Sequence, residues 1–287
     1  MARSVARVTE LPPPPDWNRH VLLGMPLDQI WRFVNPVMLY GKHLGLKSSL
    51  LRDLDSTPES ELLLSEPGRK AAEIRGHVES VKIWCKDTGL LRPRAVYQFF
   101  RAAADGDAIV VRDAAGGPAT RFDFPRQSEP GGLCLSDYVA PEGDAISLFV
   151  VTAGEGVREA AEKMKHAGEY LRSHILQALA LETAEAFAEL LHAELRRQWG
   201  FPDPLDLPMS ERFKARYRGK RYSFGYPACP RLEDQAPLFQ LLRPESIGVQ
   251  LTDGFMMDPE ASVSALVLHH PAATYFSVAE KLASCAS

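Results

Sequence analysis

The amino-acid sequence predicts an α+β fold, with a twisted antiparallel β-sheet and long helices. Two strand patterns, over residues 95–100 and 108–112, are joined by the turn Asp105-Gly106-Asp107, which is typical of a hairpin. The longest helical region, over residues 157–199, is rich in Ala, Leu, Glu and Arg. Since strands and helices follow no regular β-α-β order, we expect an antiparallel sheet and not a doubly wound parallel one.

The remaining elements follow from the spacing of apolar residues along the chain. Helical spacing over residues 27–46 is interrupted by Pro36, where we expect a break or kink. The region 157–199 should also contain a break, because single globular helices rarely reach about 40 residues. We further predict a helix over 70–85, strands over 133–139, 145–151, 246–251 and 263–269, and a last helix near Val278.

The start of the chain differs in composition from the rest. Residues 1–22 contain the run Pro12-Pro13-Pro14-Pro15, which favours an extended polyproline II spacer without a core of its own. We therefore expect a proline-rich tail or linker over residues 1–22 and one domain over residues 23–287.

Composition excludes several classes of protein. The chain has 33 Lys and Arg against 37 Asp and Glu, and this near-balance argues against a general nucleic-acid binder. The sequence contains no apolar run of about 18 residues, so it predicts no membrane span. The first residues lack the apolar stretch of a secretory signal. The four cysteines are scattered and form no C-x-x-C, so we expect a reducing, cytoplasmic location. No glycine-rich phosphate-binding loop occurs.

The segment Arg218–Pro230 is the most unusual stretch of the sequence. Gly225 permits a positive φ or a close approach to the backbone, and Pro227 and Pro230 stiffen the chain around it. Such a strap can bind a flat heterocycle through backbone groups, and Arg221 can bind a carboxylate with two parallel hydrogen bonds. A tight proline-rich turn with an exposed arginine is the alternative interpretation.

Other candidate residues have an ordinary explanation as well as a functional one. Glu182, Glu185 and Glu189 have the spacing of a solvated helix face. Cys229 could be a nucleophile, but no histidine shares its motif and a structural thiol is the simpler interpretation. His269 and His270 are adjacent on a predicted strand and face opposite sides, which argues against a shared metal.

The run Arg212–Arg221 contains six basic residues interleaved with Phe213 and Tyr217. Alternating basic and aromatic side chains can bind RNA. The same pattern is also typical of a solvated approach to a ligand site. The sequence alone leaves both interpretations open.

The ten residues Arg221-x-x-x-Gly-Tyr-Pro-Ala-Cys-Pro230 resemble the signature of one known family. This family is the S-adenosylmethionine-binding reactivation domain of cobalamin-dependent methionine synthase. The resemblance covers roughly residues 25–280 and includes, in the same order, Arg92–Tyr97, Ala103–Asp107, Leu135–Pro141, Ala184–Glu189, Ala261–Ser264 and His270–Tyr275.

The resemblance implies a role for each residue that matches the family. Arg221 would bind the carboxylate of S-adenosylmethionine, and Glu185 would pair with its ammonium group. The strap would hold the nucleoside, Tyr275 would line the site, and a small residue is common where Ser223 stands. Asn35 would replace an acidic contact of the family, keeping a hydrogen bond and losing a charge. The strap residues concerned are Gly225, Tyr226, Pro227, Ala228 and Cys229.

The resemblance also implies the function. The domain would supply the methyl group of S-adenosylmethionine for reductive remethylation of cob(II)alamin, in methionine biosynthesis. The cobalamin would be carried by a partner domain or subunit of methionine synthase, because the D-x-H-x-x-G motif of the family's cobalamin module is absent here. A flavodoxin-like or other one-electron donor would dock, and the basic run would suit it. The alternative is a non-catalytic S-adenosylmethionine-binding or corrinoid-protein docking and sensing module.

Overall fold

A seven-stranded antiparallel sheet forms the centre of the protein in a computed structural model, which describes residues 5–8, 10–51, 54, 57–112, 114, 117 and 120–278. The strand order is β4-β3-β2-β5-β9-β6, and β1 pairs with β2 beside the β2–β3 hairpin. These strands are β1 (His20–Leu23), β2 (Arg94–Asp105), β3 (Ala108–Arg112), β4 (Thr120–Asp123), β5 (Asp144–Thr152), β6 (Lys220–Tyr222) and β9 (Ser262–Leu268). A second, two-stranded sheet joins β7 (Gln250–Leu251) to β8 (Met257–Asp258).

Two long helices and several short ones surround the sheet. The long helices are α4 (Glu66–Thr88) and α6 (Tyr170–Gln198). The shorter α-helices are α1 (Leu27–Trp31), α2 (Ser48–Leu51), α3 (Glu59–Leu62), α5 (Val157–His166), α7 (Met209–Arg212) and α8 (Gln235–Leu242). A π-helix covers Val37–His43, and 3-10 turns cover Leu135–Tyr138, Leu232–Asp234 and Pro244–Ile247. Within the described ranges, no helix is long and apolar enough to cross a membrane.

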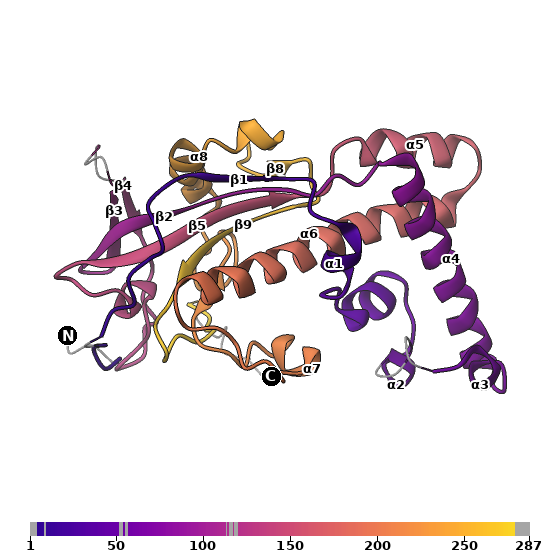
Figure 1. Ribbon diagram of the computed structural model, residues 1–287, viewed down its shortest axis with the longest axis horizontal. Coiled ribbons are helices and arrows are strands. Elements are labelled where there is room, and N and C mark those ends of the chain that lie inside the picture. The colour runs from indigo at the N-terminus through magenta and orange to yellow at the C-terminus, as the bar shows by residue number, and fades with distance from the viewer. Residues whose placement is uncertain are drawn as a thin grey trace, which may run out of the picture.

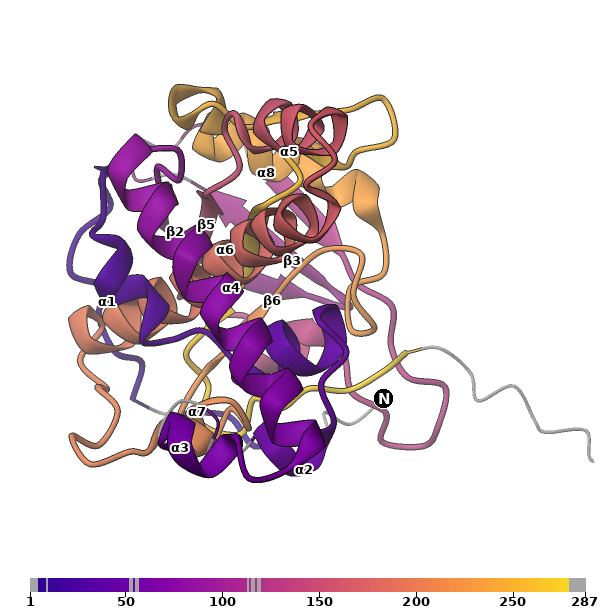
Figure 2. The same ribbon diagram turned by 90° about the vertical axis from the view of Figure 1, so that its right-hand side faces the viewer.

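The sheet has a hydrophobic core on each face, which gives the protein three layers. Helix α6 runs along one face of β2, β5 and β9, and α8 lies on the other (Figure 1). Alternate residues of β5 divide between the cores, as the period of a strand requires: Phe149 and Val151 face α6, whereas Leu148 and Val150 face α8. Helices α4 and α5 lie at the end of the molecule opposite the β3–β4 hairpin (Figures 1 and 2). The predicted α+β fold with an antiparallel sheet is confirmed.

The predicted breaks in the two helical regions are confirmed. Pro36 precedes the π-helix and separates it from α1. The region 157–199 divides into α5 and α6, and Gly168 between them has a φ of +82°. The predicted hairpin over 95–112 is β2 and β3, in register from Arg101↔Arg112 to Asp105↔Ala108.

Two local predictions differ from the structure, and a third falls largely outside the described residues. Residues 133–139 form no strand, because Asp137 accepts the Cys134 N–H at 3.0 Å and starts a 3-10 turn. Of residues 246–251 only Gln250–Leu251 pair as a strand, because Ser246 and Ile247 belong to the 3-10 turn Pro244–Ile247. Residues 271–278 contain no helix, and the residues after Val278, near which the last helix is predicted, lie outside the described part of the chain.

The proline-rich segment contacts the domain at several places, two of which involve Pro12 and β1. The Trp199 indole donates to the Pro12 carbonyl at 2.9 Å, and His20–Leu23 form β1. The predicted division at residue 22 stays a prediction, and these contacts cross it.

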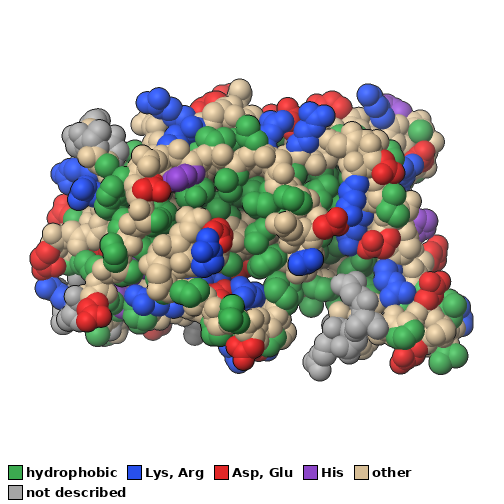
Figure 3. Space-filling view, in the orientation of Figure 1, with side chains coloured by type: hydrophobic (Ala, Val, Ile, Leu, Met, Phe, Trp, Pro, Cys, Tyr) green, Lys and Arg blue, Asp and Glu red, His purple; other side chains and the backbone are tan. Residues whose placement is uncertain are grey.

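On the face of the molecule that Figure 3 shows, hydrophobic side chains gather over the middle, and charged side chains lie mainly around them. In β1, Val21 and Leu23 remain partly exposed, so β1 is an apolar edge strand.

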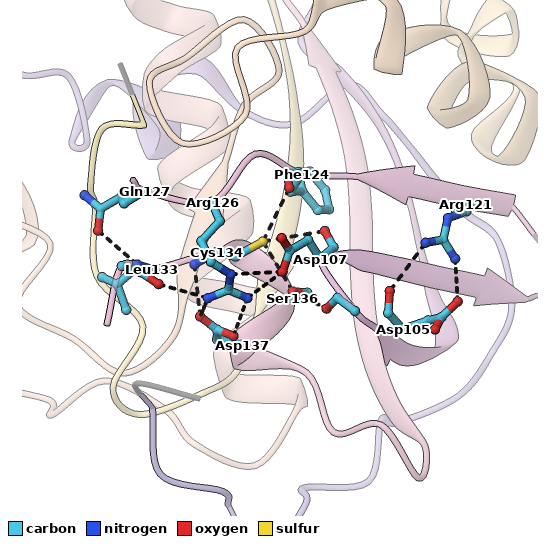
Figure 4. A network of polar contacts seen from close by, with 12 residues as sticks. Asp105, Asp107, Arg121, Phe124, Arg126, Gln127, Leu133, Cys134, Ser136 and Asp137 are labelled. Atoms are coloured by element: carbon cyan, nitrogen blue, oxygen red, sulfur yellow. Dashed lines mark hydrogen bonds and ion pairs between the residues drawn. The ribbon is translucent and has the colours of Figure 1, made fainter. Parts of the chain in front are cut away.

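The two upstream segments that resemble the family, Ala103–Asp107 and Leu135–Pro141, meet in the structure around Arg126. This guanidinium donates to Asp137 at 2.7 and 2.9 Å and to Asp107 at 2.7 and 2.9 Å (Figure 4). Asp137 is buried, whereas Asp107 is about half exposed. The network joins the turn of the β2–β3 hairpin to the 3-10 turn, so these segments have a structural role.

Candidate functional site

The acidic face of α6 is part of a pocket. Glu182 and Glu189 are buried, and only Glu185 stays substantially exposed, with 44% of its side chain accessible. The interpretation of these three residues as a solvated helix face is therefore wrong for Glu182 and Glu189. The reason is that β6 and the segment between α7 and β6 pack over Glu189, and the π-helix packs over Glu182. Periodicity along α6 does not reveal these long-range contacts.

Arg221 reaches this acidic face from the edge strand β6. It pairs with Val267 of β9, whose side chain lies in the core on the α6 side, so both point toward α6. Its Nη2 lies 3.6 Å from Oε2 of Glu185 and 3.6 Å from Oε2 of Glu189. Burial acts to lower the pKa of Arg221, but the charges of Glu189 and Glu185 outweigh it and raise that pKa. Arg221 is therefore a permanent, largely buried cation, and not an exposed arginine on a turn.

The strap after Arg221 is a closed turn stabilised by the Cys229 thiol. Cys229 N donates to the Tyr226 carbonyl at 2.9 Å with Pro227 between them, and Gly225 N donates to the Cys229 carbonyl at 2.9 Å. The Cys229 thiol donates to the Ser223 carbonyl at 2.9 Å. Burial raises the pKa of Cys229 to about 12, so the thiol stays protonated at neutral pH. The structure thus favours the structural role of Cys229 over that of a nucleophile.

Two adjoining pockets meet at the Arg221–Glu185 pair. One, of about 450 Å³, lies between α6 and the residues around the π-helix, and the other, of about 360 Å³, lies along the strap. Four residues line both pockets: Glu185, Arg221, Tyr226 and Tyr275. A charged pair at the junction can hold a zwitterionic group, with a flat group in the strap pocket beside it.

The structure brings nine of the ten predicted site residues into these pockets. Asn35 lines the first pocket, and Gly225 lines neither, because its φ of +87° forms the turn itself. Besides the four residues shared by both pockets, the strap pocket is lined by the predicted residues Ser223, Pro227, Ala228 and Cys229.

Sequence reasoning missed a second polar pair that lines the larger pocket. His43 Nε2 lies 3.1 Å from Glu182 Oε1, joining the π-helix to α6 across 139 positions. Burial, together with the charge of Glu185, raises the pKa of Glu182 to about 7. Burial also lowers the pKa of His43, and Lys42 and His174 add to this effect. Only the acidic pattern on α6 pointed to this pair, because nothing in the sequence places His43 beside it.

The basic run is largely paired within the protein. Glu211 forms ion pairs with Lys214 at 2.9 Å and with Arg216 at 2.7 Å, and Arg212 binds Asp203. Arg218 donates to the His269 carbonyl at 3.0 Å. An RNA or an acidic protein would have to compete with these contacts for the basic side chains.

The adjacent histidines at the end of β9 have separate partners. His269 Nε2 lies 2.7 Å from Asp144 Oδ1, and His270 Nε2 lies 3.1 Å from the Ala6 carbonyl. Among the residues described by the structure, no group of three His, Cys, Asp or Glu side chains could hold a metal ion.

Comparison with known proteins places this fold and pocket in a family. Residues 68–283 match the family model described as vitamin B12 dependent methionine synthase, activation domain. The chain is 30% identical to the methionine synthase of Mycobacterium tuberculosis over an alignment of 291 positions that covers 96% of the chain. It is 31% identical to the methionine synthase of Mycobacterium leprae over an alignment of 287 positions that covers 94% of the chain.

A solved structure supports the same assignment. It is described as the MetH reactivation domain bound to AdoHcy, and it superimposes with a TM-score of 0.84 at 27% sequence identity. The match covers 94% of this chain and 84% of that one. The chain therefore belongs to the activation domain family of vitamin B12 dependent methionine synthase. It spans about a quarter of the length of the curated methionine synthases that it matches, 24% and 23%.

Proposed function

We propose that this chain binds S-adenosylmethionine and supplies its methyl group for reductive remethylation of cob(II)alamin held by a methionine synthase cobalamin-binding module. The observation that carries the proposal is the Arg221–Glu185 pair at the junction of two pockets. A cation beside a carboxylate complements the α-carboxylate and α-ammonium groups of an amino acid. The related reactivation domain bound to AdoHcy, the demethylated form of the same ligand, supports this choice.

The chain's own residues would bind and orient the ligand. Arg221 would hold the carboxylate and Glu185 the ammonium group, while Asn35 and Tyr275 face the same space. The strap, from Gly225 to Cys229, would hold the adenosine portion against its fixed turn, with Ser223 beside it. A methyl group on a sulfonium is already activated for transfer, so positioning and exclusion of water are the main tasks. A protonated Cys229 thiol agrees with a site that contains no protein nucleophile.

The proposal includes partners that this chain does not contain. Cobalamin would be carried by another domain or subunit, since the matching methionine synthases are several times longer than this chain. One electron would come from a flavodoxin-like or other donor, in the cytoplasm. Because Glu211 already binds Lys214 and Arg216, an acidic donor would have to compete for these two cations.

The first experiment is calorimetric titration of the full chain with S-adenosylmethionine and with S-adenosylhomocysteine. Arg221→Ala and Glu185→Gln should each weaken binding at least tenfold, the effect of losing a charge-assisted hydrogen bond. Arg197→Ala and Glu194→Gln are matched controls, because this exposed pair also lies on α6 and lines neither pocket. Binding that ignores Arg221 would contradict the proposed site.

A second candidate function is a non-catalytic module that binds the ligand and caps or senses a corrinoid protein. It predicts the same binding and the same dependence on Arg221. The two functions separate on turnover, measured by incubating the chain with a cobalamin-loaded partner, a reductant and methyl-labelled S-adenosylmethionine. Transfer of label to the corrinoid supports the reactivation function, and binding without transfer supports the capping module.

A further inference from the structure

Beneath Arg221 lies a series of buried side chains with alternating charge, here called the buried ion network. It extends from the pocket into the space between α6 and α7. In order, its members are Arg221, Glu189, Arg196, Asp203 and Arg212, with the Tyr217 side chain beside Glu189 and Arg196.

The inner part of the network is held by close contacts. Arg196, which has no exposed side-chain surface, donates to Asp203 through Nε and Nη2, each at 2.7 Å. Its guanidinium lies 3.7 Å from the centre of the Tyr217 ring. Asp203 also binds Arg212. Buried charges persist only when such partners are fixed, so this part is a rigid support.

Glu189 links that support to Arg221. Its Oε2 accepts the Tyr217 hydroxyl at 3.0 Å and lies 3.6 Å from Arg221 Nη2. Its Oε1 lies 3.7 Å from Arg196 Nη2. Burial raises the pKa of Glu189, and the two guanidinium groups and the Tyr217 hydroxyl oppose that rise. The carboxylate is therefore held in place on both sides, by a hydrogen bond and by two cations.

Glu185 and Glu189 lie at equal distances from the same nitrogen of Arg221 but differ in exposure. Glu185 is 44% exposed and lines both pockets, whereas Glu189 is 10% exposed and lines only the larger one. Within the described part of the chain, Arg221 Nε and Nη1 form no hydrogen bond, so these donors remain for another carboxylate. We infer that Glu189, fixed by the Tyr217 hydroxyl, is a positioning residue that orients Arg221 toward the carboxylate of the bound ligand. This inference rests on the proposed function.

The test compares two ligands that differ only in the amino-acid portion. S-adenosylhomocysteine carries the carboxylate and ammonium groups, and 5′-methylthioadenosine lacks them. Tyr217→Phe removes the hydroxyl and keeps the ring beneath Arg196, and Glu189→Gln removes the charge at nearly constant volume. We expect each variant to bind S-adenosylhomocysteine about tenfold more weakly, with 5′-methylthioadenosine unchanged. Tyr97→Phe removes a hydroxyl from another partly buried tyrosine, on β2, and should change neither affinity.

Each outcome has a distinct meaning. Wild-type affinity for S-adenosylhomocysteine in both variants would overturn the inference, and so would an equal loss for both ligands, because that result indicates general damage to the pocket. Thermal unfolding of each variant separates these cases from failure to fold. If the wild-type chain binds S-adenosylhomocysteine independently of Arg221, the proposed function itself fails. If binding depends on Arg221 but not on Tyr217 or Glu189, only the positioning role fails.

Discussion

The Cys229 thiol donates a hydrogen bond to the Ser223 carbonyl at 2.9 Å, which closes the strap beside the Arg221–Glu185 pair. Cys229→Ser keeps a donor at this place, whereas Cys229→Ala leaves the buried carbonyl with one partner fewer. We expect Cys229→Ala to lower the free energy of unfolding by about 1 to 2 kcal/mol. It should also weaken 5′-methylthioadenosine binding more than Cys229→Ser does. Urea denaturation and calorimetry measure the two effects, and equal values for the two variants would contradict this role of the thiol.

Gly225 turns the strap with a backbone conformation that other residues rarely adopt. Its φ is +87°, and a Cβ on this residue would lie 2.7 Å from Leu232 Cδ2. Gly225→Ala should therefore lower the free energy of unfolding by about 1 to 3 kcal/mol. The control is Gly76→Ala in α4, where an added Cβ meets no atom within 4 Å and should stabilise by up to about 1 kcal/mol. A loss of equal size in both variants would show that strap geometry is not its cause.

Much of the fold could be predicted from the sequence because it depends on local patterns. The β2–β3 hairpin follows from a turn between two strand patterns, and the break at Gly168 follows from the length of the helical region. The sequence predicts a strand over residues 133–139, where the structure has a 3-10 turn, because the apolar residues of a buried 3-10 turn resemble those of a strand. Only the contact of Asp137 with Cys134 N–H distinguishes the two, and it depends on side-chain direction.

The candidate site was predictable where a motif carries it and hidden where only packing does. The ten residues from Arg221 to Pro230 are contiguous, so the resemblance could identify the strap directly. Glu189 and Tyr217 are 28 positions apart, and each has an ordinary interpretation by itself. Their contact exists because the segment before β6 folds over α6, a long-range feature that periodicity does not encode.

The Arg126–Asp137 pair should contribute far more to stability than a neighbouring surface pair. Asp137 is 2% exposed, so Arg126→Ala would leave a buried carboxylate without its main partner and cost about 3 kcal/mol. Arg121 binds Asp105 and Asp123, but all three side chains are about half exposed or more. Figure 4 shows Arg121 paired with Asp105. Arg121→Ala should change stability by less than about 1 kcal/mol. Thermal unfolding of the two variants checks the difference, and similar melting temperatures would contradict it.

The pKa of Glu182 makes stability depend on pH in a direction opposite to that of most carboxylates. Burial, helped by Glu185, raises this pKa from 4.5 to about 7 in the folded state. The folded protein then holds a proton that the unfolded chain has released, so stability is lost as pH rises between about 4.5 and 7. The loss should reach a few kcal/mol, since each pKa unit corresponds to about 1.4 kcal/mol.

Glu182→Gln isolates this effect, because a neutral amide cannot release a proton. We expect the difference in free energy of unfolding between Glu182→Gln and the wild-type chain to shift in favour of the variant as pH rises from 5 to 8. Urea denaturation at four or five pH values measures it. Glu194→Gln on the same helix is the control, since the Arg197 hydrogen bond lowers that pKa below 4.5. This carboxylate is ionised in both the folded and the unfolded state above about pH 5, so its difference should stay constant from pH 5 to 8. A difference that stays constant with pH would show that Glu182 releases its proton equally in the folded and unfolded states. In that case the His43 hydrogen bond, at 3.1 Å, would be stabilising the carboxylate enough to cancel the cost of its burial.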